Sequence, residues 1–149
     1  MIQRIQTLFL LIAFVLQIMM FFQPLAILQI NDATFYEIYI KGYVFNDQIQ
    51  YSYSLLIFNI ITILLNLIII FLYKNRILQM RFNIYNTILL IGLQGIVAYI
   101  IYETAHQLNA EIFLQYASIL PIIIAILHLL AFKYIKRDEE LVRSADRIR

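Results

Sequence analysis

Residues 53–73 read YSLLIFNIITILLNLIIIFLY and contain no charged side chain, and this stretch decides the fold. It belongs to a charge-free window of 26 residues, and three further windows without Asp, Glu, Lys or Arg contain 27, 21 and 21 residues. The windows are 5–31, 48–73, 82–102 and 112–132. A helix rises about 1.5 Å per residue, so 21 residues reach roughly 31 Å, enough to cross a hydrocarbon core of about 30 Å. The sequence therefore predicts four transmembrane helices, over about 6–29, 53–74, 82–103 and 111–135.

The overall composition narrows the function as well as the fold. Of the 149 residues 63% are hydrophobic and 13% are charged, against about 45–50% and about 25% in soluble domains. The chain has no cysteine, which excludes disulfides, thiol catalysis and thiolate-bound zinc. Its net charge of +2 is too small to favour nucleic acid, and it has no glycine-rich phosphate loop. We expect no enzyme, and no catalytic residue, cofactor or metal site.

The basic residues indicate how the predicted helices are oriented. If successive helices cross the membrane in opposite directions, ten of the eleven basic residues fall in segments on one side of it. They are Arg4, Lys74, Arg76, Arg81, Lys133, Lys136, Arg137, Arg143, Arg147 and Arg149. The other side carries only Lys41. Because Lys and Arg in short loops are retained in the cytoplasm, we expect both termini to be cytoplasmic.

The first outer segment has the pattern of a β-hairpin, over about 34–53. Apolar and polar side chains alternate on both sides of Asn46–Asp47, which is the period of a half-buried strand. The predicted fold class is thus an all-α membrane protein, a four-transmembrane-helix bundle with a small β-hairpin in the first outer loop. We expect one membrane domain over 1–149, in which the hairpin either caps the bundle or offers a strand edge to a partner.

A few polar side chains lie inside the predicted helices. Gln17 and Gln94 fall near mid-depth and are placed to bond each other, and His128 falls at about the depth of Asn66. These four are a candidate intramembrane polar cluster, either as the lining of a pore or as interhelical hydrogen bonds. Pro121 falls near the middle of the fourth predicted helix, where we expect a kink.

The C-terminal tail, 136–149, has the pattern of an amphipathic helix. Glu139 and Arg143 are four residues apart, as in a surface helix. Such a tail either lies on anionic headgroups, docks a partner, or extends the last helix into solvent. The candidate partner or lipid contacts are Arg4, Arg137, Asp138, Glu139, Arg143, Asp146 and Arg147.

Both ends of the chain resemble the end signatures of a known family. The opening MIQRIQT, residues 1–7, and the closing KRDEELVRSADRIR, residues 136–149, are similar to those of domain of unknown function 4293, a family of small four-helix inner-membrane proteins of Bacteroidota. The resemblance implies a multi-pass protein of the bacterial inner membrane and carries over no catalytic residue. We expect a non-enzymatic scaffold or accessory subunit of a membrane complex, in contact with the lipid bilayer and with another membrane protein or further copies of itself. The alternative is a small-solute transporter or channel that uses the polar cluster.

Overall fold

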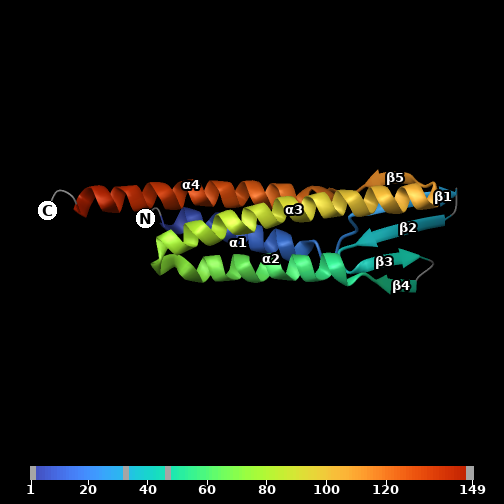
Figure 1. Cartoon of the computed structure of the whole chain (residues 1–149), viewed down its shortest axis with the longest axis horizontal. Coiled ribbons are helices and arrows are strands. Elements are labelled where there is room, and N and C mark those ends of the chain that lie inside the picture. The colour runs from blue at the N-terminus through green and yellow to red at the C-terminus, as the bar shows by residue number, and fades with distance from the viewer. Residues whose placement is uncertain (1–2, 32–33, 46–47, 147–149) are drawn as a thin grey trace.

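The structure is a computed structural model, and it describes residues 3–31, 34–45 and 48–146. Within these residues four α-helices lie side by side, and a five-stranded sheet continues the bundle at one end (Figure 1). The helices are α1 (Gln3–Met19), α2 (Tyr53–Phe71), α3 (Arg76–Leu108) and α4 (Leu120–Asp146). The strands are β1 (Ala26–Asn31), β2 (Thr34–Tyr39), β3 (Gly42–Phe45), β4 (Gln48–Tyr51) and β5 (Glu111–Leu114). The 3₁₀ turn η1 (Leu72–Lys74) joins α2 to α3 opposite the sheet, so the two ends of the bundle are termed the turn end and the sheet end.

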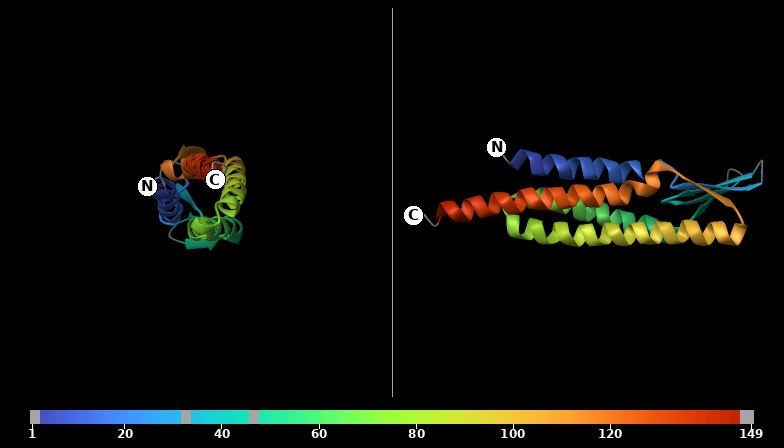
Figure 2. Two further views of the ribbon diagram at one scale, coloured as in Figure 1. Left: turned by 90° about the vertical axis from the view of Figure 1, so that its left-hand side faces the viewer. Right: turned by 90° about the horizontal axis from the view of Figure 1, so that it is seen from above.

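The four helices form a ring in which each packs against two neighbours. α1 and α3 both contact α2 and α4, so α1 and α3 occupy opposite corners, as the end-on view in Figure 2 shows. Buried positions along α2 recur every three or four residues, the spacing that keeps one side of a helix against its neighbours. They are Leu55, Asn59, Thr62, Asn66 and Ile69. Side chains between them, such as Ile57, Ile61 and Leu64, are exposed although they are apolar.

Three helical segments of the described chain are long and apolar enough to cross a membrane. They contain 22 residues (Tyr53–Lys74), 33 residues (Arg76–Leu108) and 27 residues (Tyr116–Val142). The apolar helix Ile5–Met19 is shorter. Apolar side chains outside and polar ones inside suit helices that face hydrocarbon. The prediction of a mostly helical chain with apolar helices of spanning length and a small antiparallel sheet is confirmed.

The sheet packs against the part of α3 that lies at the sheet end. Its strand order is β4-β3-β2-β1-β5, and all its pairings are antiparallel. β1 and β2 direct Leu28 and Ile38 into one core with Val97 and Ile101 of α3. The sheet is therefore a continuation of the bundle core.

The predicted hairpin is part of this larger sheet. β3 and β4 pair antiparallel, with Phe45 opposite Gln48, so the strands on either side of Asn46–Asp47 are confirmed. Asn46 and Asp47 themselves lie outside the described residues. The sequence did not predict β1 and β5, which come from the ends of two segments assigned to helices.

The helix predicted over 6–29 is wrong in its second half. α1 ends at Met19, and residues 26–31 form β1. Pro24 lacks a backbone N–H, so the helix cannot continue through it with its hydrogen bonds intact. Beyond it Leu25 N donates to Ile38 O at 2.7 Å, which begins the pairing with β2.

The helix predicted over 111–135 is displaced toward the C-terminus. Residues 111–114 form β5, the 3₁₀ turn η2 (Tyr116–Ile119) follows, and α4 begins at Leu120. Pro121 thus lies in the first turn, where a missing N–H costs no helical hydrogen bond, and the predicted mid-helix kink is wrong. The described part of the tail continues α4 to Asp146 as a single helix.

We predict that Gly42→Ala destabilises the protein by about 1–3 kcal/mol. Gly42 has φ +147°, and a Cβ at this position would lie 2.1 Å from the carbonyl oxygen of Gln50. The free energy of unfolding, measured by circular dichroism in detergent micelles, tests this. The matched control is Gly95→Ala, whose Cβ would meet no atom within 4 Å and which should leave stability unchanged or raise it by up to about 1 kcal/mol. Equal stability of the two variants would contradict the prediction.

Candidate functional site

The interior of the helix ring contains an unusual number of polar side chains. Seven of them are 0% exposed: Thr62, whose hydroxyl donates to the carbonyl oxygen of Asn59, and six amide or imidazole side chains from all four helices. These six residues, termed the amide core, are Gln17, Asn59, Asn66, Asn83, Asn86 and His128. Since a buried polar group is costly unless it is hydrogen-bonded, the partners of each one decide what the core can do.

One hydrogen-bonded pair of the amide core joins α1 to α2. Asn66 Nδ2 donates to Gln17 Oε1 at 2.9 Å, and it also lies 3.5 Å from the carbonyl oxygen of Leu10. The amide of Asn66 therefore bridges a side chain and a main-chain group of the same neighbouring helix. This fixes the height of α1 against α2.

A second group joins α3 to α4 through His128. Asn83 Nδ2 donates to the carbonyl oxygen of His128 at 2.6 Å, and the Oδ1 atom of Asn83 contacts His128 Nδ1. Asn86 Nδ2 lies 3.2 Å from His128 Nε2. With these amide orientations, Nδ1 carries the proton and donates to Asn83, and Nε2 accepts from Asn86. Every polar atom of the ring has a partner, so the imidazole serves as a connector between helices.

Other atoms of the amide core make no hydrogen bond to the described protein. They are Gln17 Nε2, Asn59 Nδ2 and Oδ1, Asn66 Oδ1 and Asn86 Oδ1. An unsatisfied buried group costs about 1–3 kcal/mol. The core thus contains both donors and acceptors that have no hydrogen-bond partner among the described residues.

The four residues of the predicted polar cluster do not meet at one place. Gln17 bonds Asn66, whereas His128 bonds Asn83 and Asn86. Gln94 lines a separate hollow of about 270 Å³ beside β5 and η2, with Tyr102 and Ser118 among its other walls. The expected bonds of Gln17 to Gln94 and of Asn66 to His128 are not among the hydrogen bonds of the described residues. The ring order explains this, because each expected pair would connect helices at opposite corners.

Sequence reasoning missed Asn83 and Asn86. They lie three residues apart at the start of the window 82–102, so they share one face of a helix. That spacing, together with their position inside a charge-free window, is a signal from which two buried polar side chains on one helix face could have been predicted.

The turn end has a second polar feature, an ion pair between α3 and α4. Arg76 Nη2 lies 3.2 Å from Asp138 Oδ2, and both side chains are largely buried. Arg76 Nη1 also lies 3.4 Å from the carbonyl oxygen of Asp138. The pair ties the first residue of α3 to the last third of α4.

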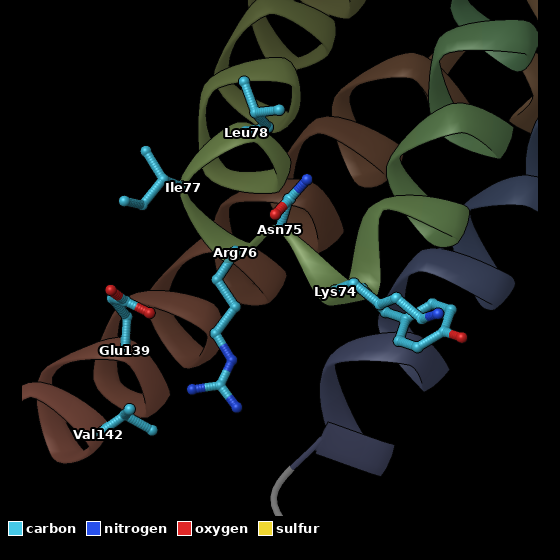
Figure 3. Close-up of a pocket in the computed structure, with 8 residues that line it drawn as sticks. Lys74, Asn75, Arg76, Ile77, Leu78, Glu139 and Val142 are labelled. Atoms are coloured by element: carbon cyan, nitrogen blue, oxygen red, sulfur yellow. The ribbon is translucent and has the colours of Figure 1, made fainter. Parts of the chain in front are cut away.

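A groove of about 660 Å³ adjoins this ion pair. Its walls come from the turn between α2 and α3, from the first turn of α3 and from α4, as Figure 3 shows. The residues of this turn groove are Tyr73, Lys74, Asn75, Arg76, Ile77, Leu78, Glu139 and Val142. Cations, a carboxylate and aliphatic side chains thus line one surface.

The candidate contacts predicted in the tail have different surroundings. Asp138 is held by Arg76, Glu139 lines the turn groove, and Arg137 is exposed. The backbone of α1 and α4 includes Arg4, Arg143 and Asp146, but their side chains lie outside what the structure describes, as does the whole of Arg147.

The first turns of α1 pack against α4. Gln6 Nε2 donates to the carbonyl oxygen of Tyr134 at 3.0 Å. The rings of Phe9 and Tyr134 stack with centroids 5.6 Å apart. The N-terminal motif therefore contacts α4 just before the C-terminal motif begins.

The sheet end offers a different chemistry, built on tyrosine. Tyr39 donates a hydrogen bond to Glu37 Oε2 at 2.8 Å, and the Lys41 ammonium lies 5.2 Å from the centroid of the Tyr39 ring. Burial raises the pKa of Tyr39, and the bond to Glu37 adds to this. The hydroxyl stays protonated at neutral pH and keeps this donor role.

These features define a class of protein: a small helical bundle with apolar helices of spanning length, a polar interior and an antiparallel sheet at one end. The model of the family described as domain of unknown function 4293 matches residues 2–148, so the chain belongs to this family. The resemblance found at the two ends of the sequence is thereby confirmed over the whole chain. No curated protein and no solved structure matches the chain.

We predict that Asn83→Ala lowers the free energy of unfolding by about 1–3 kcal/mol, because it leaves the buried His128 Nδ1–H without an acceptor. Chemical or thermal denaturation in detergent measures the loss. The control is Asn75→Ala, which removes an exposed amide with no side-chain hydrogen bond at the start of α3. If both variants are equally stable, the His128 contact does not hold the helices together.

Proposed function

We propose that this protein is a four-span protein of the bacterial inner membrane with both termini in the cytoplasm. The three helical segments of spanning length support this, as do the exposed apolar side chains along them. α1 is the fourth span in this proposal. Its 17 residues are at the lower limit of the roughly 17–25 that cross a bilayer, and the apolar residues Met20–Phe22 extend it.

Charge supports this orientation. The basic residues at the turn end, including Lys74 in η1 and Arg76 and Arg81 at the start of α3, contrast with the single Lys41 between β2 and β3. Positive residues are retained on the cytoplasmic side, so the turn end faces the cytoplasm and the sheet faces the other compartment.

Within this placement, we propose a role as a non-enzymatic scaffold or accessory subunit of a membrane complex. The observation that carries this role is the extension of α4 beyond the other helices at the turn end (Figures 1 and 2). Leu141 and Val142 on this extension are 50% and 43% exposed, and Val142 also lines the turn groove. Apolar side chains that project into water beside a charged groove mark a protein contact surface.

A small-solute transporter or channel is the second candidate. The unpartnered amide atoms of Gln17, Asn59, Asn66 and Asn86 favour it, because they provide neutral donors and acceptors inside the bundle. The separation of Gln94 and His128 from the Gln17–Asn66 pair weakens it, because a pore would need these groups along one path.

The orientation is testable because the chain has no cysteine. We predict that Gln107→Cys, at the exposed sheet end of α3, reacts with a membrane-impermeant maleimide in intact spheroplasts. Asn75→Cys, in the exposed turn, should react only after the membrane is permeabilised. The reverse pattern would overturn the orientation, and labelling of both sites in intact spheroplasts would overturn the membrane crossing.

The scaffold role predicts that the full chain co-purifies in mild detergent with a larger membrane partner. The double variant Leu141→Ser, Val142→Ser should reduce recovery of this partner about ten-fold, since it removes the exposed apolar contact. Phe113→Ser is the matched control, as Phe113 is similarly exposed, at 48%, but lies on β5. Purification of the wild-type chain alone, or equal partner recovery with the double variant, would contradict the role.

A further inference from the structure

A third hollow lies on the outside of the bundle, in the seam between α3 and α4 at the turn end. Its volume is about 370 Å³. Its residues, termed the seam pocket, are Ile77, Met80, Arg81, Ile84, Phe132, Lys136, Glu139 and Glu140. The pocket combines two cations, two carboxylates and an apolar wall, and the amide core does not use it.

The chemistry of the seam pocket changes in order along α4. Phe132, Lys136 and Glu140 follow one another at intervals of one helical turn, so they share one face. The side chains of α4 therefore pass from apolar to cationic to anionic toward the turn end. On α3, which runs antiparallel to α4, Ile84 lies deeper than Arg81, and the apolar Met80 and Ile77 lie nearer the turn end.

This order matches that of a zwitterionic phospholipid, which passes from acyl chain to phosphate to ammonium. We infer that the seam pocket binds one phosphatidylethanolamine molecule. Its phosphate lies between Arg81 and Lys136, its ammonium lies at Glu140, and the start of an acyl chain lies on Ile84. The inference rests on the membrane placement of the proposed function, which puts the turn end at the cytoplasmic interface.

Lys136 and Glu140 of the seam pocket are accessible to a headgroup. Lys136 Nζ lies 3.9 Å from Glu140 Oε1, and their side chains are 61% and 66% exposed. An exposed ion pair of this length is weak, so its two ends can turn toward a phosphate and an ammonium at little cost.

The carboxylates select against other common headgroups. A basic pocket alone would favour an anionic lipid, but two carboxylates repel a headgroup that has no cation. A trimethylammonium group cannot donate to carboxylates and is bound instead by several aromatic rings, whereas the seam pocket has Phe132 as its one aromatic side chain among the residues that line it. A primary ammonium donates to the exposed Glu140 carboxylate through its N–H groups.

The test is native mass spectrometry of the purified full chain, titrated with an equimolar mixture of palmitoyl-oleoyl phosphatidylethanolamine, phosphatidylcholine and phosphatidylglycerol. We expect the phosphatidylethanolamine adduct to be retained about ten-fold more than either other lipid. Lys136→Gln and Glu140→Gln should each remove about ten-fold of this preference. Lys133→Gln and Glu103→Gln are the matched controls, because Lys133 is exposed one turn earlier on α4 and Glu103 lies toward the sheet end of α3.

Equal retention of the three lipids would overturn the inference, as would a preference for phosphatidylglycerol or phosphatidylcholine. An equal loss in the control variants would also overturn it. Because Lys136 and Glu140 are exposed, their variants should fold, and an unchanged thermal transition confirms this. The result is independent of partner recovery, so selective lipid retention without a co-purifying protein would reject the scaffold role alone.

Discussion

The relative position of α3 and α4 depends on one buried set of hydrogen bonds, between Asn83 and the ring and carbonyl of His128. A shift of one residue along either helix would separate these groups and leave them unpaired inside the bundle, at a cost of about 1–3 kcal/mol for each group. The same register places Arg76 beside Asp138 at the turn end. It also determines how the two helices form the walls of the turn groove and the seam pocket.

Polar and apolar side chains share the interior along its length. Asn83, Asn86 and His128 lie toward the turn end, where Leu10, Ile69 and Ala131 form a small apolar cluster. Gln17 and Asn59 lie toward the sheet end, where Leu93, Val97 and Ile101 pack with the sheet. Between helices in lipid the hydrophobic effect gives no preference for one partner over another, so hydrogen bonds and close packing must select the arrangement. Where a sheet meets water, burial of apolar area is sufficient to select the arrangement.

Sequence reasoning identified the helices by length and apolar content, and it identified the strands around Asn46–Asp47 by their alternation. It failed where an apolar run changes structure without a change of polarity. Residues 26–31 and 111–114 are mostly apolar, like the helices beside them, and they become strands by pairing: β1 pairs with both β2 and β5. The pairing with β5 joins segments more than 80 residues apart in the sequence, which no local pattern predicts. The proline positions, Pro24 and Pro121, were the only local sign of the change.

The sequence predicted that the candidate site consists of neutral polar side chains inside the bundle, but it did not predict which of them bond one another. When the position of each side chain along its helix was counted from the predicted helix boundaries, Gln17 fell beside Gln94. In the structure α1 ends ten residues before its predicted end, so Gln17 lies near the end of its helix and not near the middle. The depth of Asn66 and His128 was nearly correct, yet the ring order places α2 and α4 at opposite corners. Which polar side chains bond one another inside the bundle therefore depends on which helices are neighbours. The chain connections in turn determine which helices are neighbours. The pairing of β1 with β5 brings the segment after α1 beside the segment before α4, which makes α1 and α4 neighbours. The other neighbour of α4 is α3, and His128 bonds the asparagines of α3.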